Sequence, residues 1–322
     1  METPLVSIFT LAYNHAPYIR QCLEGFLMQR TTFSFECLIH DDASTDETAD
    51  IIREYESRYP DIIKPIYQTE NQYSKGGGIT RKFLIPRAQG KYIAICEGDD
   101  YWTDPLKLQK QVDFLETHPD YTICGGMYRI LKEGDTELTE RDLLVREMKK
   151  FPKGRTVTLQ NYLEPYLLQF LTVCYRKDCF NIERLDQIKY SKDDTIYAML
   201  LEQGKGFVFP DYFGVYRMHQ SGIWAGMTNE QQIRANAEFL QEMALHFGNK
   251  SKSIRKWCFI RCIEVSFIEL KTSQHLFKDY MKMVRFTFSG KVQDVIFFQI
   301  WYFLRKSKRT FMNHYFRNKP SS

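Results

Sequence analysis

The stretch Tyr92-Ile-Ala-Ile-Cys-Glu-Gly-Asp-Asp100 decides which fold and which kind of site to expect. Its apolar first half lies between Gly90 and Glu97, which is typical of a buried strand that ends in a turn. Three carboxylates then follow at the carboxyl end of that strand. Open parallel sheets bind their ligands outside the carboxyl ends of their strands, so this acidic turn is a candidate site.

The residues before this stretch repeat the same pattern. Apolar runs predict three earlier strands, at residues 5–11, 35–40 and 62–67. Helical patterns separate them, at residues 17–29, 46–58 and 79–88. Strands separated by helices imply parallel pairing. Asp41 and Asp42 end the second strand and should therefore face the same crevice as the acidic turn. Ser44 or Thr45 is expected to cap the helix that follows.

The chain after the acidic turn alternates less regularly. Helices are expected at residues 105–118, near 158–168 and at 193–203. Extended segments are expected at residues 121–131, near 171–176 and at 207–217. Residues 133–155 are densely charged and predict a solvated excursion. We therefore expect an α/β domain over residues 1–228, with a mostly parallel central sheet flanked by helices, and a helical C-terminal extension over residues 229–322.

Charge is distributed unevenly along the 322 residues. The whole chain has 44 Lys and Arg against 40 Asp and Glu, a formal net charge of +4. Residues 250–322 hold 16 of the basic side chains but only 4 of the acidic ones, so an acidic body precedes a basic tail. The composition, 43% hydrophobic and 26% charged, is that of a globular protein and excludes the disordered and fibrous classes.

Cysteine spacing and hydropathy bear on the cellular compartment. None of the eight cysteines pairs with the spacing of a zinc ribbon or a redox motif, and the N-terminal residues lack the pattern of a secretory signal. The longest apolar run, residues 295–304, is much shorter than the roughly 20 residues of a membrane span. The sequence predicts a cytoplasmic protein without a transmembrane helix.

Both acidic clusters have a chemical and a structural interpretation. Adjacent carboxylates repel one another unless a cation or a donor lies between them, and such oxygen ligands suit Mg²⁺ or Mn²⁺ with a substrate phosphate. Alternatively, the acids at 97–100 cap the next helix or solvate a loop. One of Asp41 and Asp42 could accept hydrogen bonds from a nucleobase or ribose, whereas Asp42 could instead begin a helix.

Five blocks of sequence carry more information in their order than either acidic cluster does alone. They are Val6-Ser-Ile-Phe-Thr-Leu-Ala-Tyr-Asn14, Phe35-Glu-Cys-Leu-Ile-His-Asp-Asp-Ala-Ser-Thr-Asp46, Gly90-Lys-Tyr-Ile-Ala-Ile-Cys-Glu-Gly-Asp-Asp-Tyr-Trp102, Asp193-Asp194 and Tyr216-Arg-Met-His219. In this order they resemble the family 2 glycosyltransferases, over roughly residues 4–224. The resemblance implies a Rossmann-like GT-A fold and an enzyme that uses a nucleotide diphosphate sugar.

The resemblance also implies which residues bind the donor. The implied nucleotide-sugar-binding set is Leu11, Tyr13, Asn14, Asp41, Asp42, Arg81 and Asp99. Within it, Tyr13 and Asp42 would hold the nucleobase. Asp41 would support their turn, and Asp99 would contact the ribose. Arg81 matches a position near the diphosphate.

A second implied set concerns the metal and the catalytic base. Asp100 would bind the Mn²⁺ or Mg²⁺ ion that bridges the diphosphate. His219 matches a metal or phosphate contact of some members, with a structural histidine as the alternative. Asp194 matches the general base that accepts the proton of the attacking hydroxyl, and it could also cap the following helix. A single in-line displacement inverts the anomeric configuration. The Gln-x-x-Arg-Trp motif of processive synthases is absent, which favours transfer of a single sugar.

The substrates and partners follow from the resemblance as well. It implies a donor, with a UDP-sugar favoured, and a glycan or lipid-linked acceptor in bacterial capsule, exopolysaccharide or lipopolysaccharide synthesis. Aromatic residues interleaved with Lys and Arg in the basic tail allow three interpretations. These are packing or self-association as a homodimer, contact with an anionic membrane surface on the inner face of the cytoplasmic membrane, and, least favoured, nucleic-acid binding. We expect no nucleic-acid partner.

Two other functions stay open. A nucleotidyltransferase also combines a nucleotide-binding sheet with carboxylate-bound Mg²⁺, but it would carry a glycine-rich basic signature where this chain has Ala12-Tyr13-Asn14. A non-catalytic nucleotide-sugar-binding module of a membrane-associated complex is the second alternative. The intact acids at positions 42, 99, 100 and 194 argue against it.

Overall fold

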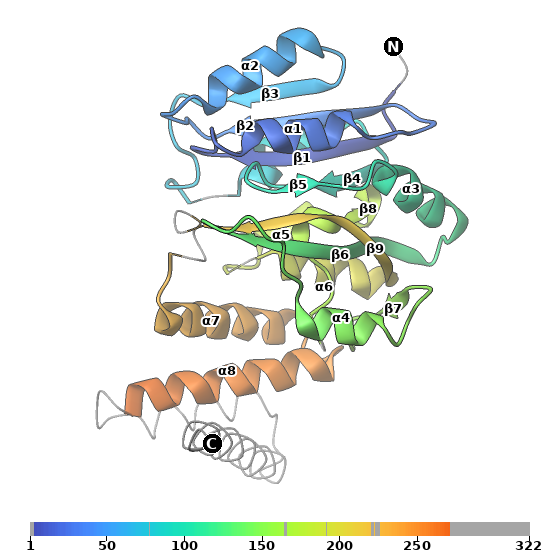
Figure 1. Cartoon of the computed structure of the whole chain (residues 1–322). Helices are drawn as coiled ribbons and strands as arrows, with labels where there is room; N and C mark the ends of the chain where they lie inside the picture. The colour runs from blue at the N-terminus through green and yellow to red at the C-terminus, as the bar shows by residue number, and fades with distance from the viewer. Residues whose placement is uncertain are drawn as a thin grey trace, which may run out of the picture. The chain divides into compact units, whose positions relative to one another are not determined.

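The chain folds into two compact units, Met1–Gly226 and Met227–Ser322 (Figure 1). The computed structural model describes residues 3–270 apart from 77, 164–165, 191, 220–221 and 223–225. The first unit contains the sheet and the candidate site, and the second contains helices in its described part.

Four parallel strands form one half of the sheet. They are β1 (Val6–Ala12), β2 (Phe35–Asp41), β3 (Ile63–Tyr67) and β4 (Tyr92–Ile95), in the order β3-β2-β1-β4 (Figure 1). β1, β2 and β4 are almost wholly buried, which explains why apolar residues dominate their sequences. Val6 pairs with both Phe35 and Tyr92, so the three strands are in register. Their carboxyl ends meet at one edge, as the sequence predicts.

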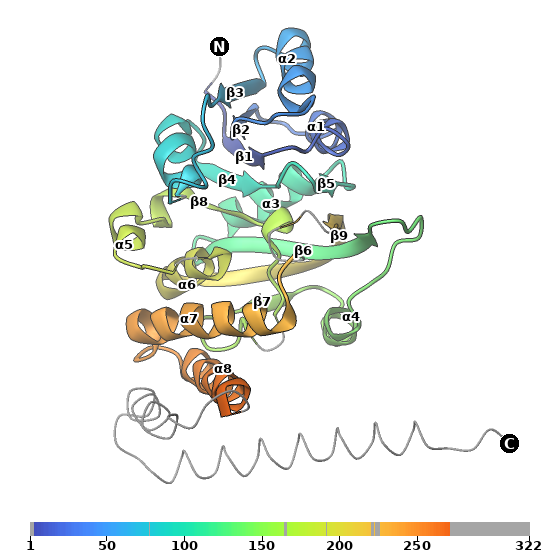
Figure 2. The same ribbon diagram turned by 90° about the vertical axis from the view of Figure 1, so that its left-hand side faces the viewer.

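Five further strands, most of whose pairings are antiparallel, complete a nine-stranded sheet. They are β5 (Tyr101–Trp102), β6 (Tyr121–Lys132), β7 (Arg155–Val157), β8 (Cys174–Arg176) and β9 (Lys205–Met218). β8 joins the two halves by pairing antiparallel with β4 and β6, while β6 and β9 run parallel side by side (Figure 2). Tyr101 of β5 lies opposite Val215 of β9. The end of β9 therefore reaches the acidic turn, which lies between β4 and β5.

Helices flank the sheet of the first unit. They are α1 (Ile19–Leu27), α2 (Thr48–Arg58), α3 (Lys107–Thr117), α4 (Asp142–Met148), α5 (Ile182–Asp186) and α6 (Asp193–Gln203). α1 buries an apolar face at helical spacing that includes Cys22 and Phe26. Phe26 packs edge-on against Trp102 of β5, with ring centroids 4.8 Å apart. α3 and α6 both contact β6.

Three local predictions need correction. Residues 79–88 do not form a regular helix but a π-helical turn, Thr80–Leu84, and a 3₁₀ turn, Ile85–Arg87. Pro86 explains this break, because proline lacks the N–H that an α-helix needs and clashes with the preceding turn. The helix expected near 158–168 is wrong, because residues 159–162 make a turn in which the Asn161 side chain accepts a hydrogen bond from Thr158 N at 2.8 Å.

The start of α2 is the third correction. Neither Ser44 nor Thr45 caps this helix, which begins at Thr48. Asp46 Oδ1 instead accepts the Thr48 N–H at 3.0 Å. The Ser44 hydroxyl accepts a hydrogen bond from Asn14 N at 3.0 Å, so it binds the turn after β1.

The second unit contains two described helices in contact, α7 (Asn229–Phe247) and α8 (Lys252–Leu270). A capping box starts α7: Thr228 Oγ1 accepts the Gln231 N–H at 3.3 Å, and Gln231 Oε1 accepts the Thr228 N–H at 2.8 Å. Among the helices that the structure describes, none combines the length and apolar character needed to cross a membrane. The helical pattern expected beyond residue 270, with most of the aromatic tail, lies outside the described residues.

Candidate active site

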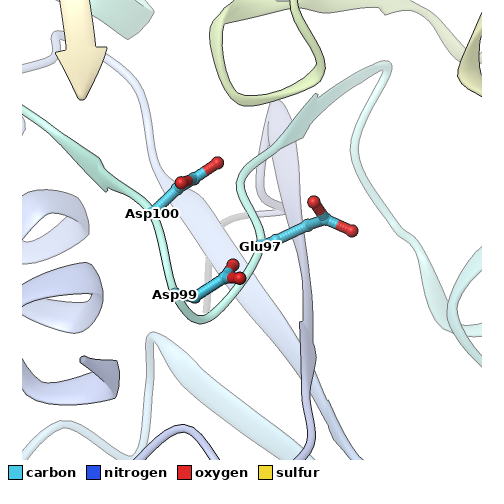
Figure 3. A group of neighbouring side chains, drawn as sticks. All are labelled: Glu97, Asp99 and Asp100. Carbon is cyan, nitrogen blue, oxygen red and sulfur yellow. The ribbon is translucent and has the colours of Figure 1, made fainter. Parts of the chain in front are cut away.

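Three carboxylates of the acidic turn form the centre of the candidate site. Glu97, Asp99 and Asp100 each offer one oxygen atom, and these atoms lie within 4.8 Å of one another (Figure 3). Gly98 N donates to the Leu11 carbonyl at 2.9 Å, which attaches the turn to the end of β1. A Cβ atom at Gly98 would lie 3.1 Å from that carbonyl oxygen and closer still to another side chain. The turn is therefore tightly held.

Negative charge is crowded in this turn. Burial, followed by the charges of Asp99 and Asp193, raises the pKa of Glu97 to about 8. Burial and the charge of Asp99 raise the pKa of Asp100 well above its usual range. A bound cation would relieve this repulsion, and closely spaced carboxylate oxygens are the ligands that Mg²⁺ and Mn²⁺ prefer. The three residues therefore fit a divalent cation.

The end of β9 contacts both aspartates of the turn. Arg217 N donates to Asp100 Oδ1 at 2.8 Å, and its Nη1 donates to the Asp99 carbonyl at 2.6 Å. His219 Nε2 lies 2.9 Å from Asp99 Oδ2, and His15 Nε2 lies 3.9 Å from the same oxygen. His219, the second predicted metal ligand, is thus brought to the acidic turn as a partner of Asp99.

Sequence reasoning missed several residues of this cluster. Arg217 lies within the Tyr216–His219 block, so the signal for it was present, whereas no local pattern marks His15. Glu97 lies in the predicted acidic turn, but the resemblance assigns it no role, although its oxygen lies with those of both aspartates.

The acidic pair after β2 has a different environment. Asp42 is 3% exposed, and its oxygens accept two backbone N–H groups, Oδ1 from Gln72 at 2.7 Å and Oδ2 from Tyr73 at 3.0 Å. Asp41 is also buried, which raises its pKa, and its Oδ1 has no hydrogen-bond partner among the described residues. Asp42 therefore holds the loop after β3, and its predicted nucleobase contact stays a prediction.

The other predicted donor-binding residues lie at the carboxyl end of β1 and in the segment that follows β3. Tyr13 is 45% exposed. Asn14 adopts a positive φ of 55°, and its Oδ1 accepts the Thr45 N–H at 2.8 Å, so it links the turns after β1 and β2. Arg81 lies on the π-helical turn and forms an ion pair with Asp186 of α5.

The predicted base lies in the first turn of α6. Burial, then the charge of Asp193, raises the pKa of Asp194 to about 7, and Asp194 Oδ1 has no hydrogen-bond partner among the described residues. The charge of Asp193 also acts on Glu97, so the start of α6 shares the electrostatic environment of the acidic turn. The N-cap residue of α6 is Lys192, so Asp194 lies inside the first turn and is not the capping residue. A carboxylate with a raised pKa suits general-base catalysis.

Residues 7–179 match the family model described as Glycosyl transferase family 2. The chain belongs to this family. An uncharacterized protein of Mycobacterium tuberculosis is 36% identical over 222 residues, which are 68% of this family 2 chain and 60% of the relative. The chain thus spans about three-fifths of the length of the first curated relatives it matches.

Two further relatives of this family 2 chain carry a more specific description. The putative teichuronic acid biosynthesis glycosyltransferase TuaG of Bacillus subtilis is 27% identical over 262 residues, 80% of this chain and 94% of TuaG. WfaP of Escherichia coli, a UDP-Glc:α-D-GlcNAc-diphosphoundecaprenol β-1,3-glucosyltransferase, is 39% identical over 124 residues, 38% of this chain and 46% of WfaP.

Solved structures show the fold of this family 2 chain. S. aureus TarS 1-349, in complex with UDP-GlcNAc, superposes with a TM-score of 0.62 at 17% identity, covering 89% of this chain and 82% of that TarS fragment. The mannosyltransferase PcManGT of Pyrobaculum calidifontis, in complex with GDP-Man and Mn²⁺, superposes with a TM-score of 0.53 at 15% identity, covering 89% and 85%. The likeness to TarS, with the family match, confirms the predicted GT-A fold.

Proposed function

We propose that this chain transfers a single sugar from a nucleotide diphosphate sugar to a hydroxyl group of a glycan or lipid-linked acceptor, with inversion at the anomeric carbon. The observation that carries the proposal is the crowding of Glu97, Asp99 and Asp100 at the carboxyl ends of parallel strands. The raised pKa of Asp194, in the same electrostatic environment, supports a base acting next to a cation site. The donor diphosphate needs the cation, and the acceptor hydroxyl needs the base.

The acidic turn is the proposed site of a divalent cation, Mn²⁺ or Mg²⁺. Asp100 would be a ligand, and His219 is a second candidate. A bound cation supplies positive charge that stabilises the diphosphate as it leaves. The Arg217 N–H engages Asp100 Oδ1, which leaves Oδ2 of that carboxylate for the cation. The Mn²⁺ in the PcManGT complex supports a cation in this fold.

The proposed donor is a UDP-sugar. TarS was solved with UDP-GlcNAc, and WfaP is described as a transferase that uses UDP-Glc. The proposed contacts are Leu11, Tyr13, Asn14, Asp41, Asp42, Arg81 and Asp99. The exposed ring of Tyr13 is available to stack on a nucleobase.

The proposed acceptor belongs to a bacterial surface polysaccharide, such as capsule, exopolysaccharide or lipopolysaccharide. TuaG is described as a teichuronic acid biosynthesis enzyme, and WfaP as acting on a diphosphoundecaprenol-linked sugar. These descriptions support a glycan or a lipid-linked glycan.

Asp194 is the proposed general base. As the acceptor oxygen attacks the anomeric carbon, Asp194 takes the hydroxyl proton, and the bond to the donor phosphate breaks with its electron pair leaving on the diphosphate. The unpartnered Oδ1 has free capacity to accept that proton. Attack from the side opposite the leaving group produces inversion.

Thermal stabilisation by nucleotide diphosphates tests the proposal. We expect UDP to raise the melting temperature only in the presence of Mn²⁺ or Mg²⁺, and to do so more than GDP or ADP. If none of these nucleotides gives a metal-dependent shift, the proposed function is wrong. Release of pyrophosphate from a sugar phosphate and a nucleoside triphosphate would instead indicate a nucleotidyltransferase.

Asp194→Asn tests the base separately from donor binding. Loss of a general base lowers the rate by roughly 100-fold to 10,000-fold, so we expect hydrolysis or transfer of a UDP-sugar to fall by that factor. The Mn²⁺-dependent stabilisation by UDP should be unchanged. Asp142→Asn is a matched control, because Asp142 occupies the first turn of α4. Substantial activity in Asp194→Asn would remove the assignment of Asp194.

We further propose that the protein is cytoplasmic and that the basic tail, residues 250–322, brings it to the inner face of the membrane or joins two copies. The eight cysteines, all within the described residues, form no disulfide, which supports a reducing compartment. Flotation with vesicles of anionic lipid at low and at high salt tests membrane contact, because salt screens attraction between exposed charges. No flotation at low salt would contradict the membrane proposal, and light scattering would then report on the homodimer.

A further inference from the structure

Arg217 makes an unusual set of contacts for a residue at the end of a strand. Its backbone N–H binds Asp100 Oδ1, and its Nη1 binds the Asp99 carbonyl. Its Nη2 donates to Gln21 Oε1 of α1. One arginine thus connects β9, the acidic turn and α1.

Two aromatic rings restrict the guanidinium group of Arg217. Its Cζ lies 4.5 Å from the ring centroid of Tyr101 and 5.2 Å from that of Tyr18. Such cation–π contacts, combined with donors in a rigid planar fork, hold an arginine in one orientation. Lysine could replace the charge of Arg217 but not the fork.

The guanidinium binds the backbone of the acidic turn rather than its carboxylates. Nη1 reaches the carbonyl oxygen of Asp99, whereas the carboxylate of Asp99 is contacted by histidines. A guanidinium paired with the carboxylates themselves would compete with a cation for the same oxygens. The observed contact restrains the turn and adds a positive charge nearby, while it leaves those oxygens to a ligand.

We propose that Arg217 is a positioning residue that holds Asp99 and Asp100 in the arrangement that the metal and donor require. This inference rests on the proposed function. Adjacent carboxylates repel each other, so without the restraint the turn would relax into arrangements with the oxygens farther apart. The cation would then have to rebuild the site as it binds, and its apparent affinity would fall.

Titration of Mn²⁺ at fixed UDP, followed by thermal stabilisation, tests this role. A hydrogen bond from a charged group contributes enough to change an equilibrium constant by about tenfold or more. We therefore expect Arg217→Met to need about tenfold more Mn²⁺ for half of the shift, and Arg217→Lys to be intermediate. At saturating Mn²⁺ the hydrolysis of a UDP-sugar should return close to the native rate. A merely structural role would lower the melting temperature without moving the Mn²⁺ midpoint.

Arg129→Met is the matched control. Arg129 of β6 also stacks on a tyrosine, with its Cζ 4.6 Å from the ring centroid of Tyr212. Its Nε lies 3.9 Å from Glu140 Oε1. We expect this variant to keep the native Mn²⁺ midpoint. If Arg217→Met does not fold, Gln21→Met removes the Nη2 acceptor alone and should raise the midpoint by a smaller factor.

The outcomes separate this inference from the proposed function. A native Mn²⁺ midpoint in both Arg217→Met and Arg217→Lys, or in Gln21→Met where that variant is used instead, overturns the role of Arg217 alone. A native chain that shows no Mn²⁺-dependent shift with UDP contradicts the proposed function and this inference with it.

Discussion

The acidic turns after β2 and after β4 look alike in sequence but differ in what their carboxylates contact. Asp42 directs both oxygens at backbone N–H groups of Gln72 and Tyr73, at 2.7 and 3.0 Å. In the turn after β4, the carboxylate oxygens of Glu97, Asp99 and Asp100 instead lie within 4.8 Å of one another. In the first turn, backbone N–H groups stabilise the negative charge of Asp42. In the second turn, three carboxylates lie close together.

This difference separates a structural carboxylate from one that is ready to bind a ligand. A carboxylate that accepts two backbone N–H groups is stabilised in its charged form by the fold. Glu97 and Asp100, in the turn after β4, have raised pKa values because the fold buries them beside another carboxylate. Aspartates at equivalent strand ends can therefore differ in how far the fold itself already satisfies their charge.

Asp100→Asn should have the largest effect on binding. We expect at least a 100-fold loss of apparent Mn²⁺ affinity in the presence of UDP, because even residues that only support metal ligands change affinity by about 10-fold to 100-fold. The free energy of unfolding without metal should stay the same or rise, because one repelling charge is removed. Titration and chemical denaturation measure the two quantities. Native Mn²⁺ affinity in this variant would end the assignment of the turn after β4 as the cation site.

Asp42→Ala should affect stability more than ligand binding, the reverse of Asp100→Asn. Its two backbone partners would lose a charged acceptor, so we expect the free energy of unfolding to fall by about 2 kcal/mol. UDP affinity should fall less than in Asp100→Asn. Urea denaturation and UDP titration of the two variants side by side measure this contrast. If Asp42→Ala keeps the native stability but loses UDP binding, the nucleobase contact outweighs its role in the loop.

The pH dependence of stability gives the smallest of the three effects. The pKa of Glu97 rises from 4.5 to about 8 on folding, so protonation favours the folded chain. This contribution is fully present below about pH 4.5 and is lost as the pH rises through about 8. Without metal, we therefore expect the melting temperature of the native chain, relative to Glu97→Gln, to fall by a few °C between pH 5 and pH 9.

Saturating Mn²⁺ should reduce that pH dependence, because the cation takes the place of the proton. Asp42→Ala should keep the dependence, since it leaves the turn after β4 intact. Calorimetry of the three proteins across the pH range measures both differences. The same pH dependence in Glu97→Gln as in the native chain would contradict the raised pKa.

The parallel half of the fold could be predicted from sequence because apolar residues dominate each of its buried strands. The register of Val6 with Phe35 and Tyr92 then brings the acidic ends together. The rest of the sheet was harder to predict, because β7 and β8 have only three residues each. In addition, the Asn161 side chain stabilises a turn where the sequence predicts a helix. The periodicity of apolar residues predicts which face of an element is buried, but it does not predict such side-chain hydrogen bonds.

The residues of the candidate site also fall into a predictable and an unpredictable group. Its acids follow strands and were visible as residue types. Their partners are remote, since Asp42 and Gln72 are 30 positions apart and Asp100 and Arg217 are 117 positions apart. Contacts at such separations depend on how strands pair, which a local pattern does not specify. The distinction between the two acidic turns therefore required the structure.

Gly98 has a consequence for the redesign of this site. A side chain there would begin 2.8 Å from His15 Nδ1 and 3.1 Å from the Leu11 carbonyl, so the centre of the acidic turn has no space for variation. Tyr13 and Tyr73, by contrast, are 45% and 56% exposed on neighbouring loops. A mutant library aimed at new donors should keep residues 97–100 constant and place its diversity at these two tyrosines.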